Sequence, residues 1–518
     1  MAGSLLTICY TLVFSGFNLI ITVAITRRSV FPEAAFILRQ TIFMNITDSR
    51  FIIFKYLLVL LVTISISTSC SHFKAQQRQQ PEGRLPKTFS LYSQGSEQPD
   101  KWWKSFNDKE LDNLVEISLA GNLSLKEAWA RLMQSKALAL QAGSLLVPGL
   151  TGDAGTSHSR QKTKSSTISR QTVKNYSLGL VSSYELDLWG KIKSQQEAAI
   201  LEASASREDF NTIAMTLAAE VTEQWINIIS QRMQKRLLEE QLKTNITYLE
   251  LIQLRFRNAM VSALDIYQQK QVVEKVKGRI PLVEAQEKIL LNKLALLLGK
   301  APDADIKINR DGLPALQELP STGIPADVLS RRPDIRSAGL RLKAVDWKIA
   351  AAKADRLPNI DLTLSLKLNS ESLGLLLDNW LIGFASKLTA PILDGNRRKV
   401  EVNRQIAMAD ENLASYRSTV LTAIKEVEDA LISEAKQKEH IEALEREIKA
   451  AKSALNEARE RYRKGLNEYL PVLTQLLTVQ NLEIDIIQKK AQLILDRISL
   501  HRALGGTWMR EIEQKQRF

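Results

Sequence analysis

The side chains that most often perform chemistry in proteins are few and widely spaced in this sequence. The chain of 518 residues has two cysteines and four histidines, which are Cys9, Cys70, His72, His158, His440 and His501. This set contains neither a disulfide framework nor the close Cys and His spacings of a metal site. Phosphate-binding, dinucleotide-binding, GxSxG and HExxH motifs are also missing in their required contexts. We therefore predict that the protein is not an enzyme and holds no metal or cofactor.

Cys70 is the residue of this set whose surroundings form a pattern. It ends the stretch RFIIFKYLLVLLVTISISTSC, residues 50–70, in which basic residues precede an apolar core over 56–66 and a run of small residues. This is the layout of a secretory signal peptide. Its ending resembles a bacterial lipoprotein signal, in which the cysteine carries lipid, although Ser67 stands where such signals usually have Leu. Ser71, rather than Asp, favours the outer membrane. Ordinary cleavage that leaves a free cysteine is the alternative.

A second apolar stretch precedes this signal. Residues 5–25, LLTICYTLVFSGFNLIITVAI, are long enough to span a bilayer. Two export signals in tandem are redundant, and Met44 lies just before the better one. We interpret residues 1–43 as a mis-called extension and 44–70 as the signal peptide, with a genuine N-terminal membrane helix as the alternative.

The net charge of +13 is compatible with nucleic acid, with anionic lipid or with no specific partner. No helix-turn-helix, zinc-finger or RNA-recognition signature accompanies it. We therefore do not expect a nucleic-acid partner.

The elements that must position any functional residue occur twice. An offset of 206 aligns four landmarks, namely Glu220-Val221 with Glu426-Val427, Arg255-Phe256-Arg257 with Arg461-Tyr462-Arg463, Leu264 with Leu470, and Leu298-Gly299 with Leu504-Gly505. An offset of 210 aligns Leu125 with Ile335 and Pro148 with Pro358. So long a period indicates two half-molecules rather than a solenoid. We predict a linker over 71–100, a first repeat over 101–300, a connector over 301–332, a second repeat over 333–508 and a tail over 509–518.

Each copy is predicted to contain a short helix, two strands and a long helical hairpin. In the second copy, apolar residues recur every seven positions, interrupted by Glu434, at Leu413, Val420, Val427, Ile441, Ile448, Leu455 and Tyr462. This is a coiled-coil seam. A helix over about 398–463 would be roughly 100 Å long at 1.5 Å per residue.

The strand patterns add a membrane interpretation. In residues 360–369, IDLTLSLKLN, apolar and polar residues alternate strictly; residues 176–188 repeat the period with Ser182 out of place, and a looser strand begins at Trp380. A weak fourth strand is expected near 150–162. Strands with one apolar and one polar face suit a barrel that faces lipid outside and water inside. A soluble half-buried sheet shows the same alternation. Because four strands cannot close a barrel, several copies must share one, and a threefold ring would supply twelve strands.

Together these features resemble the TolC-like outer-membrane efflux factors, specifically the lipoprotein branch that works with resistance-nodulation-division pumps. The resemblance covers about residues 100–510, and five segments carry it: WWKSFNDKELDNLVEISLAGN at 102–122, SRRPDIRSA at 330–338, APILDGNRRK at 390–399, ERYRKGLNEYLPVL at 460–473 and LHRALGGTW at 500–508.

The resemblance implies an α+β membrane protein. Such a protein is a homotrimer with a shared twelve-stranded β-barrel in the outer membrane, a long α-helical barrel through the periplasm and a mixed equatorial region. It consumes no energy and forms the exit duct for a proton-driven inner-membrane pump, joined through a periplasmic adaptor. Two alternatives remain: the duct of type I protein secretion, and a coiled-coil envelope lipoprotein without a channel.

The resemblance also assigns roles to the two turns RFRNAMVSALDIY and RYRKGLNEYLPVL. They match the periplasmic mouth, which rings of Leu and Asp constrict in the family. Leu470 matches the Leu position, while Thr474 stands where related proteins commonly carry Asp. Asp265, which follows Leu264 in the first copy, is expected to supply charge at the mouth instead. Gate ion pairs or adaptor contacts are expected from Arg461, Arg463, Arg255, Arg257 and Gly465. Solvated cations at helix C-termini are the plainer interpretation of the arginines.

Overall fold

The computed structural model describes residues 6–15, 18–27, 73, 88–89, 100–164, 168–302, 304–320, 325–509 and 512. The chain divides into two units, residues 1–72 and 73–518. In the first unit, strands β1 (Leu6–Ser15) and β2 (Asn18–Arg27) form an antiparallel hairpin. The alternative of a membrane helix over 5–25 is therefore wrong for these described residues. The stretch is rich in Ile, Val and Thr, whose branched side chains favour strands.

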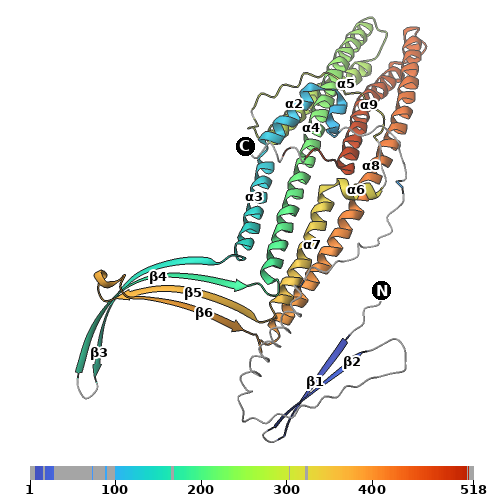
Figure 1. The fold of residues 1–518 in the computed structure, drawn as a ribbon. Coiled ribbons are helices and arrows are strands. Elements are labelled where there is room, and N and C mark those ends of the chain that lie inside the picture. Colours follow the sequence, from blue (N-terminus) through green and yellow to red (C-terminus); the bar gives the residue numbers. More distant parts are fainter. Residues whose placement is uncertain are drawn as a thin grey trace. The chain divides into compact units, whose positions relative to one another are not determined.

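The second unit repeats one series of elements, as predicted (Figure 1). The first copy contains η1 (Trp102–Phe106), α2 (Lys109–Gly121), α3 (Leu123–Ser144), β3 (Gly149–Lys164), β4 (Ile168–Leu186), α4 (Lys191–Arg257) and α5 (Ala263–Leu297). The second contains α6 (Pro325–Arg331), α7 (Pro333–Ala354), β5 (Asn359–Ser370), η2 (Leu373–Leu375), β6 (Trp380–Thr389), α8 (Arg397–Arg463) and α9 (Tyr469–Leu504).

The element bounds reproduce both offsets. The offset of 206 relates both ends of α4 to both ends of α8, and the start of α5 to the start of α9. The offset of 210 relates both ends of α3 to both ends of α7. The predicted long helix over 398–463 matches α8 within one position at its start. Gly190 and Asn396, which the offset of 206 also relates, precede the long helices in the left-handed conformation, with φ of 74° and 66°. The duplication is thus confirmed, and it includes the turns that lead from the sheet into α4 and α8.

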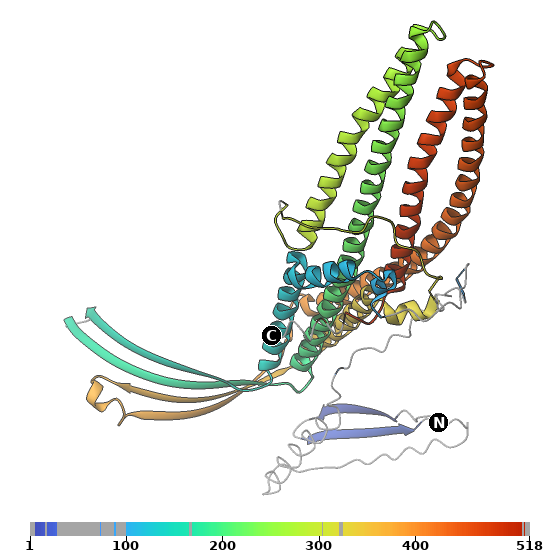
Figure 2. The same ribbon diagram turned by 90° about the horizontal axis from the view of Figure 1, so that it is seen from above.

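In one layer, two helices of the first copy lie beside two helices of the second. α3 packs on α4, α4 on α7, and α7 on α8, while α5 and α9 fold back along α4 and α8 as two antiparallel hairpins (Figure 2). Pairs of opposite charge join α4 to α7, including Arg336 Nη2 to Glu208 Oε2 at 2.8 Å and Lys348 Nζ to Glu202 Oε1 at 2.9 Å. Among the described residues, none of the helices has both the length and the apolar content needed to cross a membrane.

The largest apolar cluster lies at the equator and joins chain segments that are distant in sequence. Trp102 and Trp103 of η1 are each 1% exposed, and Trp103 meets Trp508 edge to face with ring centroids 4.7 Å apart. Trp225 of α4 and Ile498 of α9 belong to the same cluster. This core holds η1 and the residues that follow α9 against the long helices. It corresponds to the expected mixed equatorial region.

A buried histidine in this region predicts a pH dependence of stability. The ring of His501 is 4% exposed and stacks on Trp102, with centroids 5.2 Å apart. Burial, followed by the nearby charge of Arg497, lowers the pKa of His501 from 6.5 to about 3. Below pH 6.5, His501 is therefore protonated in the unfolded chain but stays neutral in the folded protein. The stability contributed by neutral His501 is complete above pH 6.5 and is lost as the pH falls toward 3.

We expect the His501→Phe variant, which keeps an aromatic ring on Trp102, to remove this dependence. Between pH 7 and pH 5 the wild-type protein should lose about 2 kcal/mol more unfolding free energy than the variant. Urea titrations followed by circular dichroism at both pH values measure the difference. Equal losses in the two proteins would show that His501 is not held neutral.

Candidate functional site

The four-stranded sheet has two faces of opposite character. Its order is β3-β4-β5-β6, all antiparallel. One face is apolar across the strands, and its exposed members include Leu150, Leu178, Leu180, Leu364, Trp380, Ile382, Phe384 and Leu388. Leu364 is 51% exposed and its neighbour Phe384 is 70% exposed. So large an exposed apolar surface indicates contact with lipid or protein.

The other face of the sheet is polar. The residues that alternate with the apolar set on β5 are Asp361, Thr363, Ser365, Lys367 and Asn369. Strands β3 and β6 are the edges of this sheet, and each has one neighbouring strand among the described residues. A sheet with one apolar face and two open edges is incomplete for a bilayer, where backbone groups must be paired.

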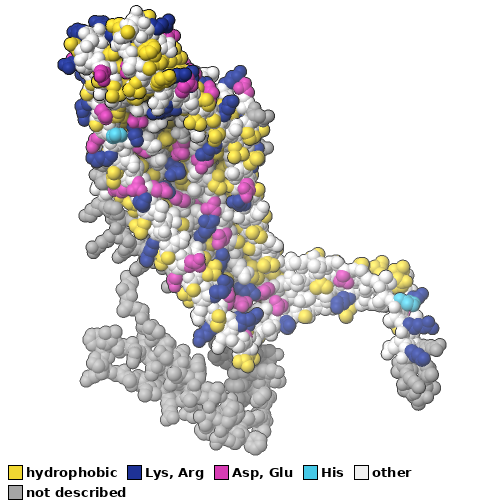
Figure 3. Space-filling model, turned by 180° about the vertical axis from the view of Figure 1, so that it is seen from behind, with side chains coloured by type: hydrophobic (Ala, Val, Ile, Leu, Met, Phe, Trp, Pro, Cys, Tyr) yellow, Lys and Arg dark blue, Asp and Glu magenta, His cyan; other side chains and the backbone are white. Residues whose placement is uncertain are grey.

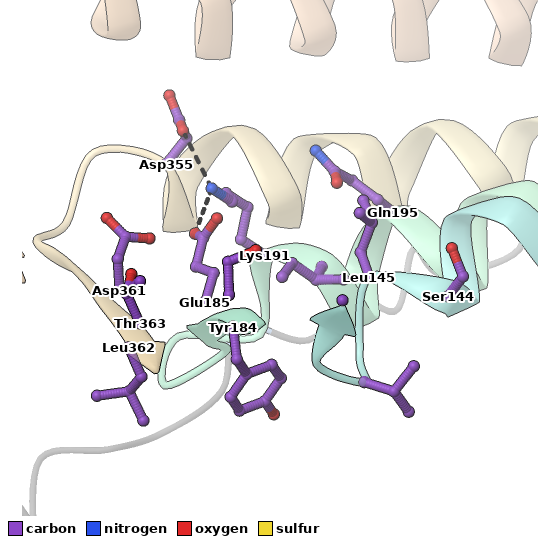
Figure 4. Close-up of a pocket in the computed structure, with 14 residues that line it drawn as sticks. Ser144, Leu145, Tyr184, Glu185, Lys191, Gln195, Asp355, Asp361, Leu362 and Thr363 are labelled. Atoms are coloured by element: carbon purple, nitrogen blue, oxygen red, sulfur yellow. Dashed lines mark ion pairs between the residues drawn. The ribbon is translucent and has the colours of Figure 1, made fainter. Parts of the chain in front are cut away.

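A charged cluster marks the junction of the sheet with the helices. It lines a recess of about 580 Å³ between β4, β5, α4 and α7 (Figure 4). Lys191 Nζ lies 2.5 Å from Glu185 Oε1 and 4.0 Å from Asp355 Oδ1. Asp361 pairs with Glu185 across the strands, so two carboxylates lie side by side. Lys191 offsets this negative charge where the polar face of the sheet meets the helices.

The predicted gate residues lie at the two helical turns. Leu264 and Leu470 are the second residues of α5 and α9 and are 62% and 52% exposed. Thr474, one turn farther along α9, is exposed, and its hydroxyl donates to Leu470 O at 2.9 Å. Asp265 accepts hydrogen bonds from the Ser262 backbone N–H and hydroxyl, both at 3.0 Å. Asp265 therefore closes a capping box at the start of α5, in which Ser262 is the N-cap residue.

The arginines of the turns do not all act alike. Arg461 pairs with Glu457 at 2.9 Å and Arg463 with Glu460 at 3.0 Å, in both cases on the exposed surface of α8 itself. Such pairs contribute little, roughly 0–1 kcal/mol. Both ion pairs lie within α8, and the predicted role of Arg461 and Arg463 at the gate or in adaptor docking stays a prediction. Arg257 is exposed at the end of α4.

Gly465 and its counterpart in the first copy form the turns themselves. Gly465 adopts a φ of 74° after α8. Ala259, which the offset of 206 relates to Gly465, adopts the same left-handed conformation with a φ of 56°. Glycine adopts this conformation without steric cost, whereas alanine does not. The left-handed turn therefore explains why glycine stands at position 465, in addition to the predicted role in docking.

Cation–π contacts join the two hairpins, and the sequence analysis did not predict them. The guanidinium of Arg255 on α4 lies 4.2 Å from the ring centroid of Tyr462 on α8. In the opposite direction, Arg459 on α8 lies 5.4 Å from the ring of Tyr248 on α4. Cation–π contacts of this kind contribute about 0.5–2 kcal/mol each. Of the predicted arginines, Arg255 is the one that joins the two copies.

A buried polar network continues the contact below the turns. The Tyr469 hydroxyl donates to Gln269 Oε1 at 2.7 Å, and Gln269 Nε2 donates to Asn245 O at 2.8 Å. Asn245 Nδ2 reaches Gln480 Oε1 at 3.2 Å, and Gln241 Nε2 donates to Gln480 O at 3.0 Å. These side chains come from α4, α5 and α9. Since each amide here needs a partner to remain buried, the network fixes the register of the hairpins.

Among the described residues, no group of three or more His, Cys, Asp or Glu is placed to hold a metal ion. Cys70 lies outside the described residues. The assembled features are a one-sided apolar sheet, a charged junction and two narrow helical turns. These features are typical of a channel rather than of a catalytic centre.

Known proteins share this arrangement. A family model described as outer membrane efflux protein matches residues 114–300 and 324–506. The outer membrane protein OprJ of Pseudomonas aeruginosa is 31% identical over 414 residues, covering 78% of this chain and 86% of OprJ. The pyoverdine export outer membrane protein OpmQ of the same species is 29% identical over 416 residues, covering 79% of this chain and 87% of OpmQ.

Solved structures agree. The outer-membrane channel OprN superimposes with a TM-score of 0.78 at 26% identity, covering 84% of this chain and 100% of OprN. The open state of the MtrE outer membrane channel of Neisseria gonorrhoeae gives 0.74 at 26% identity, covering 84% and 98%. These proteins are channels rather than enzymes, as the sequence predicted for this chain. With its duplicated helical hairpins and one-sided sheet, the chain belongs to the outer membrane efflux protein family, a family of channels in the bacterial outer membrane.

Proposed function

We propose that three copies of this protein form the exit duct of a tripartite efflux system. The duct conducts small molecules that a proton-driven inner-membrane pump of the resistance-nodulation-division class expels through a periplasmic adaptor. The observation that carries the proposal is the open sheet with one apolar face. In lipid, the edges of β3 and β6 require strands from other copies. Four strands from each of three copies make twelve, enough to close a barrel.

The helices support the same assembly. Each copy contributes two hairpins, α4 with α5 and α8 with α9. The 67 residues of α4 or α8 correspond to a length of roughly 100 Å. Six hairpins from three copies would continue the barrel as a tube into the periplasm. The polar face of the sheet would line the wet interior, and the junction charges around Lys191 would mark the passage from barrel to tube.

A lipid anchor belongs to the proposal. Cys70 follows a signal with the layout of a lipoprotein, and Ser71 favours retention in the outer membrane. The intact mass of the mature protein tests this directly. A mass that places Cys70 first and adds three acyl chains supports the anchor, and an unmodified cysteine contradicts it.

The two helical turns are the proposed periplasmic mouth. Leu470 and Leu264 are exposed in one copy and are available to meet their equivalents around a threefold axis. A ring of leucines in a narrow pore excludes water and stops ions. The contact of Arg255 with Tyr462 would hold the hairpins in the closed arrangement. Docking of the adaptor would favour an open one. Asp265 would contribute charge near the mouth while it caps α5.

Conductance in planar bilayers tests the mouth. We expect Leu470→Ala to raise the conductance of the reconstituted channel several-fold, because the smaller side chain leaves room for water. Leu466→Ala is the matched control, since Leu466 is 69% exposed in the same turn but precedes α9. It should leave conductance at the wild-type level. Unchanged conductance in Leu470→Ala, or an equal rise in the control, would show that Leu470 is not the constriction.

A small-molecule cargo is favoured over type I protein secretion by the relatives. They include a toluene efflux pump outer membrane protein and an antibiotic efflux pump outer membrane protein, both of Pseudomonas putida and both 28% identical to this chain. A coiled-coil tether without a channel has no use for the exposed apolar face that runs across four strands.

A further inference from the structure

The hairpin of β3 and β4 extends beyond the rest of the sheet. Strand β4 pairs with β5 as far as Tyr176, opposite Ser370, whereas its pairing with β3 continues to Ile168, opposite Lys164. Eight further residues on β4 correspond to roughly 25 Å of strand. This extension lies at the end of the sheet remote from the helices (Figure 1).

The charge of this extension has one sign. Residues 154–184 contain no Asp or Glu, and their basic residues are His158, Arg160, Lys162, Lys164, Arg170 and Lys174. The described side chains of this set, on His158, Arg160, Lys162 and Lys174, are all exposed. Figure 3 shows a histidine and several Lys and Arg side chains gathered at this end of the sheet. We call His158, Arg160, Lys162 and Lys174 the basic set.

Register places every member of the basic set on the apolar face of the sheet. The members occupy even positions on both strands, as do Leu150 on β3 and Leu178 on β4. The β3–β4 pairing is continuous from Gly149 to Lys164 and contains no bulge, so the alternation of faces is preserved. The opposite face of the extension carries Ser, Thr, Gln, Asn and Val. On the extension, the face that is apolar elsewhere in the sheet is therefore basic, while the opposite face is uncharged.

The change occurs at an aromatic boundary. Tyr176 and Trp380 lie on the apolar face at the far limit of the leucines, and Tyr184 lies near the helices. Aromatic residues flank the apolar band of membrane barrels on both sides. The 11 paired residues from Tyr176 to Leu186 correspond to roughly 37 Å of strand, or close to 28 Å across a bilayer at a tilt of about 40°. This matches the height of such a band.

The first basic pair follows directly after this boundary. His158 lies opposite Lys174, one step of two residues beyond Tyr176, and Lys162 lies opposite Arg170. Like charges at directly opposite positions, as in the pairing of Lys162 with Arg170, destabilise a hairpin unless anions lie between them. The outward face just above the apolar band is where the head groups of lipids lie.

We propose that the basic set binds the phosphate groups of a phosphorylated glycolipid in the outer leaflet of the membrane. The inference rests on the proposed membrane placement of the sheet. Lys and Arg form charge-assisted hydrogen bonds to phosphate oxygens. The lipid's acyl chains would contact the leucines below Tyr176 while its phosphates neutralise the paired cations above. The glycolipid thereby stabilises the hairpin end that projects from the barrel.

The test measures lipid binding by the full-length protein in detergent, with native mass spectrometry as the readout. The probes are lipid A with two phosphates and the same lipid after dephosphorylation. We expect the wild-type protein to bind the phosphorylated lipid at least tenfold more tightly. The variant R160Q/K162Q/K174Q should lose that preference. The variant K367Q/K387Q removes two exposed lysines from the opposite face of the same sheet and should bind as the wild type does.

A face-swap variant separates position from net charge. The substitutions R160Q/Q161R/K162T/T163K keep the composition but move two cations to the other face. We expect binding to fall as it does in the triple variant. Wild-type binding by the face-swap variant, equal loss in K367Q/K387Q, or equal affinity for the dephosphorylated lipid would each overturn the proposal. Displacement of the lipid by millimolar inorganic phosphate would show that the set serves a soluble anion, and would also overturn it.

Channel activity is read separately. In phosphatidylcholine bilayers, the wild-type protein and the variant R160Q/K162Q/K174Q should conduct equally, because the basic set lies on the face that points away from the passage. Absence of conductance in the wild-type protein would contradict the proposed function. Loss of lipid preference alone would not.

Discussion

Arg497→Met is expected to lower the unfolding free energy by about 3–5 kcal/mol, because it leaves the Glu434 carboxylate buried without its partner. Arg497 Nε and Nη2 lie 2.8 and 2.5 Å from the two oxygens of Glu434, and the side chains are 6% and 10% exposed. Arg497 Nη1 also donates to the backbone carbonyls of Gln317 and Glu318. The pair therefore joins α8, α9 and the connector between the repeats.

Two further variants serve as controls for Arg497→Met. The double variant R497M/E434L replaces the pair with apolar side chains and should regain most of the lost stability. Arg463→Met breaks an exposed pair with Glu460 and should cost about 0–1 kcal/mol. Urea titrations in detergent, followed by helical circular dichroism, measure all three. A cost for Arg497→Met no larger than that for Arg463→Met would show that the buried pair is not formed.

Leu364→Arg is expected to prevent insertion of the sheet into membranes. An arginine near the middle of the lipid-facing surface of a barrel costs about 2–4 kcal/mol, and the cost arises in every copy of the assembly. Leu364 is 51% exposed in the single chain. In a sheet that faced water, the same substitution would therefore cost no more than about 0.5 kcal/mol. The size of the effect separates lipid from water as the neighbour of this face.

Thr363→Arg is the matched control. Thr363 precedes Leu364 on β5 and lies on the polar face, opposite Ser183 and Ala385. Refolding of each variant into phosphatidylcholine vesicles, followed by protease protection, gives the inserted fraction. The control should insert as the wild type does. Similar insertion of both variants would mean that the apolar face does not contact lipid.

The duplicated helices were predictable because their signal is long and repeated. The offset of 206 relates α4 to α8 at both ends, and Val420, Val427 and Leu455 of the predicted seam are buried. Glu434 occupies a seam position where an apolar residue is expected, and the heptad pattern gives no reason for a Glu there. Its partner, Arg497, lies 63 positions away on the returning helix, and this distance depends on how the hairpin folds.

The strands were predictable only where they alternate. Strand β5, predicted over 360–369, is observed as Asn359–Ser370. The weak strand predicted near 150–162 is observed as β3, which continues to Lys164. The strand predicted to begin at 176 is observed as β4, which begins at Ile168. In this extension basic and uncharged polar residues replace the apolar ones, so a hydrophobic alternation cannot reveal it.

The candidate gate was predictable in place but not in its contacts. Leu470 and Leu264 lie at the turns, as the repeat implied. Arg255 meets Tyr462 across the hairpins, whereas Arg461 stays on its own helix. Which of these arginines crosses depends on the rotation of α8 about its axis relative to α4. The pattern of a single helix contains no information about that rotation.

The number of chains in the detergent-solubilised particle tests the central claim most directly. One copy has four strands and two open edges, so it needs others to complete a barrel. Native mass spectrometry of the protein extracted from membranes should show three copies of the mature chain, and the same particles should conduct ions in planar bilayers. A monodisperse monomer that remains in water and does not enter bilayers would contradict the account.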